Sequence, residues 1–275
     1  MKSILSRGLP DPVHELLWFC HRQLLACVFG VLLLAGLLLT KHWAEAAPLS
    51  RQDFLFLYAL GLQIALIVFR LEHREEVVVI LAFHLLATVM EWFKTSPAIG
   101  SWQYPAEGVI FRVYQVPLFA GFLYSSVGSY IARAWRLLEF RFIAYPPVWM
   151  TAILAGLAYL NFFTHHFVAD IRWILIAASV VLFWRCRLTF RTGRRVRTIP
   201  LLAGLLAVAF LIWIAENAGT YARAWVYPDQ IEGWKPVSLQ KFWAWYLLMI
   251  LSFVLVSFVN LRRGSGGSAS LSRDS

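Results

Sequence analysis

The sequence predicts an all-α fold, a polytopic transmembrane helical bundle with about eight spans. Of its 275 residues, 60% are apolar and 15% are charged, whereas soluble domains are about 45–50% apolar and about 25% charged. Apolar runs of the length that crosses a bilayer, roughly 17–25 residues, recur along nearly the whole chain. This recurrence argues against a cleaved signal peptide and favours one bundled domain.

The spans are bounded by charged residues or by Pro and Gly. The eight candidates are 18–40, 54–71, 77–94, 114–133, 148–164, 171–188, 199–217 and 242–261. We expect residues 1–261 to form a single transmembrane helical domain with candidate halves 1–141 and 142–261. The polar, small-residue-rich segment 262–275 is expected to be a disordered C-terminal tail.

Basic residues predict how the chain is oriented. If the N-terminus is inside, the inner segments hold sixteen Lys and Arg residues and the outer segments hold eight. Because flanking basic residues are retained in the cytoplasm, both termini are expected on the cytoplasmic side of a bacterial inner membrane. Six of the sixteen lie in 185–197, which we interpret as a topogenic loop that touches anionic lipid headgroups. This placement accounts for the net charge of +10 without a nucleic-acid partner.

Cysteine and histidine spacing predicts neither a disulfide framework nor a metal site. Cys20, Cys27 and Cys186 show no CxxC spacing, and no HxxxH pattern occurs. The sequence also has no P-loop, no GxSxG and no GxGxxG after a strand. We therefore expect no metal and no cofactor, and the sequence gives no signal for an oligomeric state.

Two segments on the predicted outer side resemble each other, EWFKTSPAIGSWQYPAEG at 91–108 and ENAGTYARAWVYPDQIEG at 216–233. Each begins with Glu at the end of a span, has Thr four residues later, continues with Trp-x-Tyr-Pro and ends with Glu-Gly. Four spans separate them, which predicts a parallel internal repeat with both segments at one depth. The candidate substrate-binding residues in and near them are His84, Trp102, Tyr104, Arg112, Asn217, Thr220, Arg223, Trp225 and Tyr227.

A third polar cluster, NFFTHHFVADIRW at 161–173, falls on the same predicted side. A charged residue at the bilayer centre costs about 2.5–3.5 kcal/mol, so such residues usually face a partner or a water-filled cavity. We therefore predict an outer-half pocket. Its candidate catalytic residues are Glu91, Glu216, His165, His166 and Asp170.

Each assignment has a structural alternative. The Trp and Tyr residues suit an interfacial aromatic belt. His84 suits a packing position that is hydrogen-bonded to a neighbouring helix. Glu91 and Glu216 suit structural ion pairs with Arg112, Arg223 or Lys94.

A family resemblance covers residues 15–261. The stretches that carry it are FHLLATVMEWFKT, GSWQYP, VPLFAGFLYSSVGSYIARAWR, YLNFFTHH, AENAGTYARAWVYP and LLMILSFVLVS. They resemble an uncharacterised family of bacterial multi-spanning membrane proteins, domain-of-unknown-function family 817, which implies no activity.

A shorter resemblance is to membrane-embedded carotenoid hydratases and lycopene cyclases. It rests on Glu216, Gly219, Thr220 and Tyr227, and on Glu91, Gly100, Trp102, Tyr104 and Val116-Pro117-Leu118. The resemblance implies polyene hydration or cyclisation with carboxylates as proton donors. The spacing and the added His-His segment depart from that pattern.

These observations leave three hypotheses for the function. The first is an enzyme that performs general acid–base chemistry on an isoprenoid or lipid substrate in the outer half of the bilayer, because burial disfavours the charged form of a carboxyl and keeps a proton available. The second is a small-solute or proton-coupled transporter that uses the acid–His cluster. The third is a structural or assembly protein, which leaves both acidic motifs unexplained.

Overall fold

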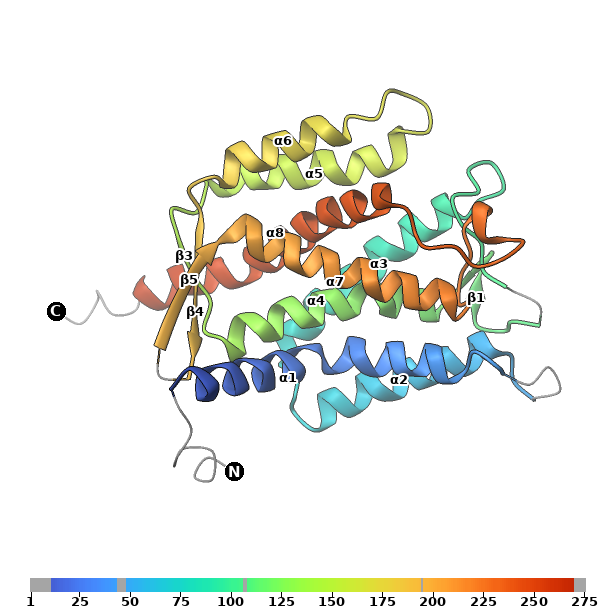
Figure 1. Cartoon of the computed structure of the whole chain (residues 1–275), viewed down its shortest axis with the longest axis horizontal. Helices are drawn as coiled ribbons and strands as arrows, with labels where there is room; N and C mark the ends of the chain where they lie inside the picture. Colours follow the sequence, from blue (N-terminus) through green and yellow to red (C-terminus); the bar gives the residue numbers. More distant parts are fainter. Residues whose placement is uncertain (1–10, 44–47, 106–107, 194, 270–275) are drawn as a thin grey trace.

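The structure, a computed structural model, describes residues 11–43, 48–105, 108–193 and 195–269. It confirms the predicted fold class, because helices that run along the long axis of the molecule make up most of the chain (Figure 1). The helices are α1 (Asp11–Leu39), α2 (Arg51–Val68), α3 (Arg74–Lys94), α4 (Phe119–Leu137), α5 (Val148–Thr164), α6 (Arg172–Phe183), α7 (Leu201–Tyr221) and α8 (Leu239–Ala269).

Five of the described helices, α1, α2, α3, α7 and α8, are long and apolar enough to cross a membrane. α5 and α6 are apolar but have 17 and 12 residues. A 12-residue helix is about 18 Å long, less than the roughly 30 Å of a hydrocarbon core. The chain is therefore a multi-pass membrane protein, and the count of eight spans stays a prediction.

The predicted span limits agree best at α5 and least at α8, and they also differ by several residues at α1, α4 and α6. We expected the sixth span to reach 188, but α6 ends at Phe183 because a strand begins at Arg187. We expected a tail from 262, whereas α8 continues to Ala269. No proline lies between 239 and 269 to interrupt that helix, and the remaining 270–275 lie outside the described residues.

α4 is the central helix, and it packs against α1, α2, α3 and α8. Its approach to α3 depends on two glycines. A Cβ on Gly121 would lie 2.4 Å from the His84 ring, and one on Gly128 would lie 2.8 Å from the Phe83 ring. Small residues let membrane helices approach this closely. α4 can be less apolar than its neighbours because protein surrounds it on several sides.

The segment that we interpreted as a topogenic loop forms a β-hairpin. β4 (Arg187–Thr192) pairs with β5 (Arg195–Pro200) and with β3 (Arg141–Ile143), all antiparallel, in the order β3-β4-β5. Polar and apolar residues alternate in RLTFRT, which is the period of a strand. Gly193 takes the positive φ of 66° at the turn.

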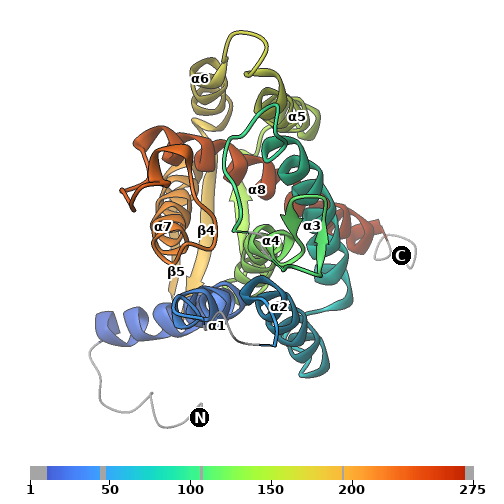
Figure 2. The same cartoon turned by 90° about the vertical axis from the view of Figure 1, so that its right-hand side faces the viewer.

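The sheet lies at one end of the helices and the aromatic loops lie at the other (Figures 1 and 2). The far end carries the α5–α6 connection, the short pair β1 (Arg112–Val113) and β2 (Val116–Pro117), and a 3₁₀ turn at Pro228–Gln230. The three segments that we expected on the outer side therefore share one end. Which side of the membrane this end faces stays a prediction.

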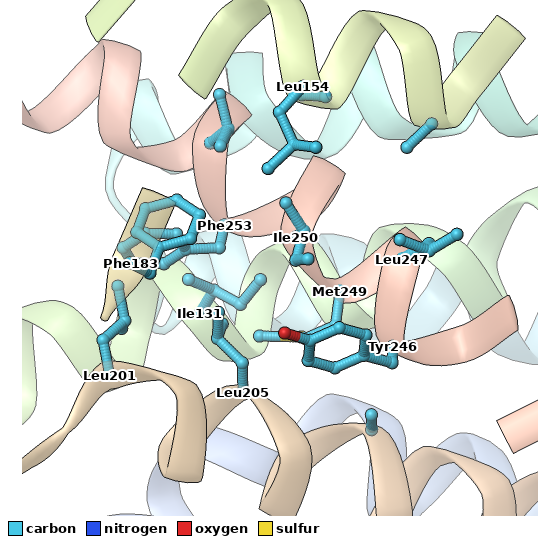
Figure 3. Close-up of a cluster of buried hydrophobic side chains, with 14 of the residues drawn as sticks. Ile131, Leu154, Phe183, Leu201, Leu205, Tyr246, Leu247, Met249, Ile250 and Phe253 are labelled. Atoms are coloured by element: carbon cyan, nitrogen blue, oxygen red, sulfur yellow. The ribbon is translucent and has the colours of Figure 1, made fainter. Parts of the chain in front are cut away.

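α8 packs against both α5 and α7. Its side chains Leu247, Ile250 and Phe253 meet Leu154 of α5 and Leu205 of α7 in one buried cluster (Figure 3). This packing holds α8 in place, and the N-terminal part of α8 carries Lys241 and Trp245, which line the cavity described below.

Candidate functional site

A cavity of about 980 Å³ runs beside α1, α4, α7 and α8. Acidic, basic and aromatic residues line its end near the aromatic loops. Its remaining length is mainly apolar, with leucines of α1 and α4 and Val208 of α7 in the wall, and it reaches Cys27 and Cys20 of α1. The cavity therefore has one polar end and one long apolar arm.

Exposed residues in its wall indicate that the cavity is open between α1 and α7. Leu24 and Val31 of α1 and Leu211 of α7 line it and are 65%, 51% and 60% exposed. In a bilayer, this opening would meet lipid chains and not water.

Glu91 lies at the C-terminal end of α3, buried against the cavity, within a set of hydrogen-bond donors. Its Oε2 accepts from Trp102 Nε1 at 2.9 Å and from the Tyr104 hydroxyl at 2.8 Å. Its Oε1 accepts from the Tyr124 hydroxyl at 2.7 Å. The loop after α3 supplies two of these donors and α4 supplies the third.

Glu216 lies near the C-terminal end of α7 in a similar arrangement. The Tyr227 hydroxyl donates to its Oε1, and Trp245 Nε1 of α8 donates to its Oε2. Each glutamate is therefore held by the tyrosine of its own Trp-x-Tyr-Pro segment and by an aromatic residue of the next helix.

The two carboxyl sites touch through their donors. The Trp102 and Tyr227 rings lie 6.3 Å apart, and the Tyr124 and Trp245 rings lie 5.9 Å apart. The two Trp-x-Tyr-Pro segments also pair with each other at their middle residues. The Gln103 amide donates to the Val226 carbonyl, and the Val226 amide donates to the Gln103 carbonyl, each at 2.9 Å.

The histidine cluster lies at the mouth of the same cavity. Lys94 Nζ is 2.8 Å from His166 Nε2 and 3.4 Å from His165 Nε2. Asp170 accepts from the Asn161 amide at 2.9 Å and forms an ion pair with Arg172 at 3.1 Å. All five candidate catalytic residues therefore line one cavity, as do four of the candidate substrate-binding residues, Trp102, Tyr104, Trp225 and Tyr227.

The environment favours the neutral form of the histidines and tyrosines of these loops. Burial, together with the charge of Lys94, lowers the pKa of His166 to about 4, and burial also lowers the pKa of His165. Burial raises the pKa of Tyr104 and of Tyr227 well above the ordinary value, and the neighbouring glutamates raise it further. At neutral pH the imidazoles are therefore neutral and can accept hydrogen bonds, and the phenols remain hydrogen-bond donors.

His84 lies outside the cavity, although it is on the same helix as Glu91. Its ring packs on Gly121 and stands 5.0 Å from the Phe122 ring centroid. α4 covers this part of α3, so the placement matches the packing alternative.

Four more candidate residues also lie outside the cavity. Asn217 Oδ1 accepts from the Val237 amide at 2.9 Å, and Thr220 Oγ1 accepts from Trp234 Nε1 at 3.2 Å. Both bonds tie the 222–238 connection to α7. Arg112 and Arg223 are exposed. The repeat shows which positions correspond, but it does not show which face of a loop points inward.

Four residues of the polar end were not among the candidates, namely Tyr124, Trp245, Lys94 and Lys241. Tyr124 and Trp245 follow their glutamates at unequal distances, 91 to 124 and 216 to 245, so the match between the two segments does not reveal them. Extension of the comparison into α4 and α8 would have drawn attention to both aromatic residues.

Among the described residues, neither glutamate forms an ion pair with Arg112, Arg223 or Lys94. The hydrogen-bond partners of both carboxyls are uncharged. The described part of the chain also brings no three His, Cys, Asp or Glu side chains together as metal ligands.

Fold and site together define a multi-pass α-helical membrane protein with an amphipathic internal cavity. The chain belongs to the family described as "Protein of unknown function (DUF817)", which matches residues 15–253. It is 38% identical over 245 residues to the Uncharacterized protein YoaT of Bacillus subtilis (strain 168), covering 89% of this chain and 91% of that protein.

Solved structures with a related arrangement include the mycobacterial Insig homolog MvINS from Mycobacterium vanbaalenii and a cross-linked trimer of MvINS. Each match covers 70% of this chain and 97% of the MvINS chain, with 17% sequence identity and a TM-score of 0.47.

Proposed function

We propose that this protein is an enzyme that performs general acid–base chemistry on an isoprenoid or other lipid held in the cavity. The observation that carries this proposal is the pair of buried glutamates, each bonded only to neutral donors, along one apolar cavity. The two-to-one excess of basic residues on the opposite side favours an outer-half location in a bacterial inner membrane.

The donors indicate where each carboxyl would hold its proton. An indole N–H donates and cannot accept, so Oε2 of each glutamate must remain an acceptor for Trp102 or Trp245. The proton of a neutral carboxyl then belongs on Oε1. There the hydroxyl of Tyr124 or Tyr227 can turn to accept it.

This placement suits hydration of a carbon–carbon double bond. The carboxyl O–H bond breaks, the π electrons of the double bond form a new C–H bond with the released proton, and the other carbon of the double bond becomes a carbocation. The π faces of the tryptophans stabilise the cation. Water adds to the cation, and its released proton goes to the second carboxylate or to His165 or His166. The net change is the addition of one water, without an oxidant or reductant.

The test replaces each acid by its closest neutral analogue in Glu91→Gln and Glu216→Gln. A Gln oxygen can accept the Trp bond while its amide donates to the Tyr oxygen, so both variants should fold. We expect activity to fall by about 10²–10⁴-fold, the range for loss of a general acid or base. Glu232→Gln, on an exposed position of the same outer connection, is the matched control.

The measurement is lipid mass spectrometry of a deletion strain that expresses the wild type, each Gln variant or the control. The wild type and the control should produce a lipid that differs from its precursor by one water. The Gln variants should not. If all lipid profiles coincide and only vesicles with the wild type show solute or proton flux, the protein is a transporter and the enzyme proposal is wrong.

A further inference from the structure

Two lysines at the polar end of the cavity lack a carboxylate partner. Lys94 is only 4% exposed, and its ammonium contacts two imidazole nitrogens. Lys241 points its ammonium at aromatic rings, 4.2 Å from the Tyr227 centroid and 5.6 Å from that of Trp102. In the described part of the chain, no acidic side chain lies within ion-pair distance of either lysine.

The acidic side chains nearby form hydrogen bonds or ion pairs with groups other than these lysines. Glu91 and Glu216 take their hydrogen bonds from tyrosines and tryptophans. Asp170 pairs with Arg172. The two histidines beside Lys94 are neutral at pH 7, so they accept a hydrogen bond but supply no negative charge. The polar end therefore holds two lysines without a carboxylate partner in a partly desolvated site, where the charged form of each is costly unless an anion is present.

The rest of the cavity fits a long apolar chain. Its lining residues on α1 extend from Leu37 to Cys20, which spans about 25 Å at roughly 1.5 Å per residue. Between them the wall is mainly leucine and valine, and the opening beside Leu24 and Leu211 reaches the outer surface.

We infer that Lys94 and Lys241 form a subsite for the anionic head group, a phosphate or carboxylate, of a long-chain lipid whose tail lies along α1. This inference rests on the proposed function only in that it names the class of lipid held in the same cavity. The head group would lie beside Glu91 and Glu216, and the first part of the chain would pass the two carboxyls. The opening between α1 and α7 would admit the tail from the bilayer.

Cys27 gives a direct reporter of occupancy because it lines the apolar arm. The full chain with Cys20→Ser and Cys186→Ser is placed in phosphatidylcholine nanodiscs, and the rate of Cys27 labelling by a membrane-permeant maleimide is measured. Hexadecyl phosphate and palmitate are the anionic probes, hexadecanol is the neutral probe and inorganic phosphate is the headgroup alone.

We expect both anionic probes to slow Cys27 labelling at lower membrane content than hexadecanol. Lys94→Gln and Lys241→Gln should each weaken the anionic probes by about tenfold or more, the range for a lost charge-assisted hydrogen bond, and leave hexadecanol unchanged. Lys235→Gln, in the exposed part of the outer connection, should change neither. Lys94→Arg should retain most of the affinity, which shows that loss in the Gln variant comes from charge and not from misfolding.

Equal protection by hexadecanol and the anionic probes, with no effect of either Gln variant, would overturn the subsite. Competition by inorganic phosphate as strong as by hexadecyl phosphate would overturn the lipid head group as its ligand. The same titration in Glu91→Gln and Glu216→Gln separates the two proposals. Retained binding with lost lipid product supports both, whereas retained binding with no wild-type product refutes the enzyme proposal alone.

Discussion

At the scale of single residues, the buried acid Asp53 differs from Glu91 and Glu216 in its hydrogen-bond donors. Asp53 accepts from the backbone amides of Ile110 and Phe111 and from the Ser50 hydroxyl. Backbone amides are fixed donors that cannot accept, so Asp53 anchors the loop before α4. Glu91 and Glu216 instead face tyrosine hydroxyls, which can both donate and accept. This difference is why we assign proton exchange to the glutamates and a structural role to Asp53.

His166 gives a prediction at the same scale. Its pKa of about 4 in the folded protein lies below the ordinary value of about 6.5. Between these values an unfolded chain takes up a proton that the folded protein refuses, so the stability that the neutral imidazole contributes is lost as the pH falls. We expect the wild-type Tm to decrease more than that of His166→Asn when the pH drops from about 7 to about 5.

The measurement is thermal unfolding of both proteins in one detergent at a series of pH values. Equal slopes of Tm against pH would show that His166 does not titrate in this way.

The sequence predicted the acids of the site better than their surroundings. Glu91 and Glu216 stand out because a carboxylate near hydrocarbon is costly, whatever it contacts. Tyr124 and Lys241 do not stand out, because aromatic residues and lysines are common at helix ends near the interface. Thr220, a shared position of the repeat, and its neighbour Arg223 lie outside the cavity, since the loop conformation, and not the spacing, sets their direction.

At the scale of elements, the packing of α4 against α3 depends on small residues. Its face toward α3 carries Gly121, Ser125 and Gly128, and the rings of His84 and Phe83 occupy the space of the missing side chains. The position of Tyr124 between these small residues means that close packing also sets the distance from its hydroxyl to Glu91. The α3–α4 contact therefore connects packing with the geometry of the site.

Gly128→Ala tests this contact. Its Cβ would meet the Phe83 ring at 2.8 Å, and overpacking of this kind costs about 1–3 kcal/mol. Gly156→Ala on α5 is the matched control, because nothing lies within 4 Å of its Cβ and alanine favours a helix by about 1 kcal/mol. We expect a lower Tm for Gly128→Ala and an unchanged or higher Tm for Gly156→Ala. Equal Tm values would refute close packing at Gly128.

Helices and strands were predictable where a single sequence pattern set their limits. α5 begins after Pro147 and ends at Thr164, in agreement with the predicted limits, because a proline and a polar cluster bound a continuous apolar run. The strands β4 and β5 were missed because their arginines resembled a charged loop. Glu15 forms ion pairs with Arg195 and Arg197 at 3.0 and 2.6 Å, and these partners across the fold are not visible in a local pattern.

At the scale of the whole molecule, several helix contacts come in corresponding pairs. α3 packs on α4 as α7 packs on α8, α1 packs on α4 as α5 packs on α8, and α1 meets α7 as α5 meets α3. The pairing of Gln103 with Val226 joins equivalent positions of the two motifs. A two-fold axis produces this kind of self-complementary contact. These correspondences support our proposal of a parallel four-helix repeat.

The orientation of the molecule can be tested with single cysteines in a cysteine-free background. Val168, Val196 and Ile231 are all well exposed, so a cysteine at each should label without disturbing the fold. A membrane-impermeant reagent added to intact cells should label positions 168 and 231, and position 196 only after lysis. The basic residues on the sheet side set this expectation. Labelling of position 196 in intact cells would reverse the orientation.

The sideways opening between α1 and α7 makes the concentration of ligand in the membrane, and not in water, the one that governs binding. A ligand that enters there is partitioned into the bilayer and never has to dissolve in water. Occupancy then follows the ratio of ligand to phospholipid in the membrane, and the volume of the surrounding solution has no influence. A poorly soluble lipid that is scarce in the whole cell can thus have a high local concentration beside the cavity, because it partitions into the bilayer that contains the protein.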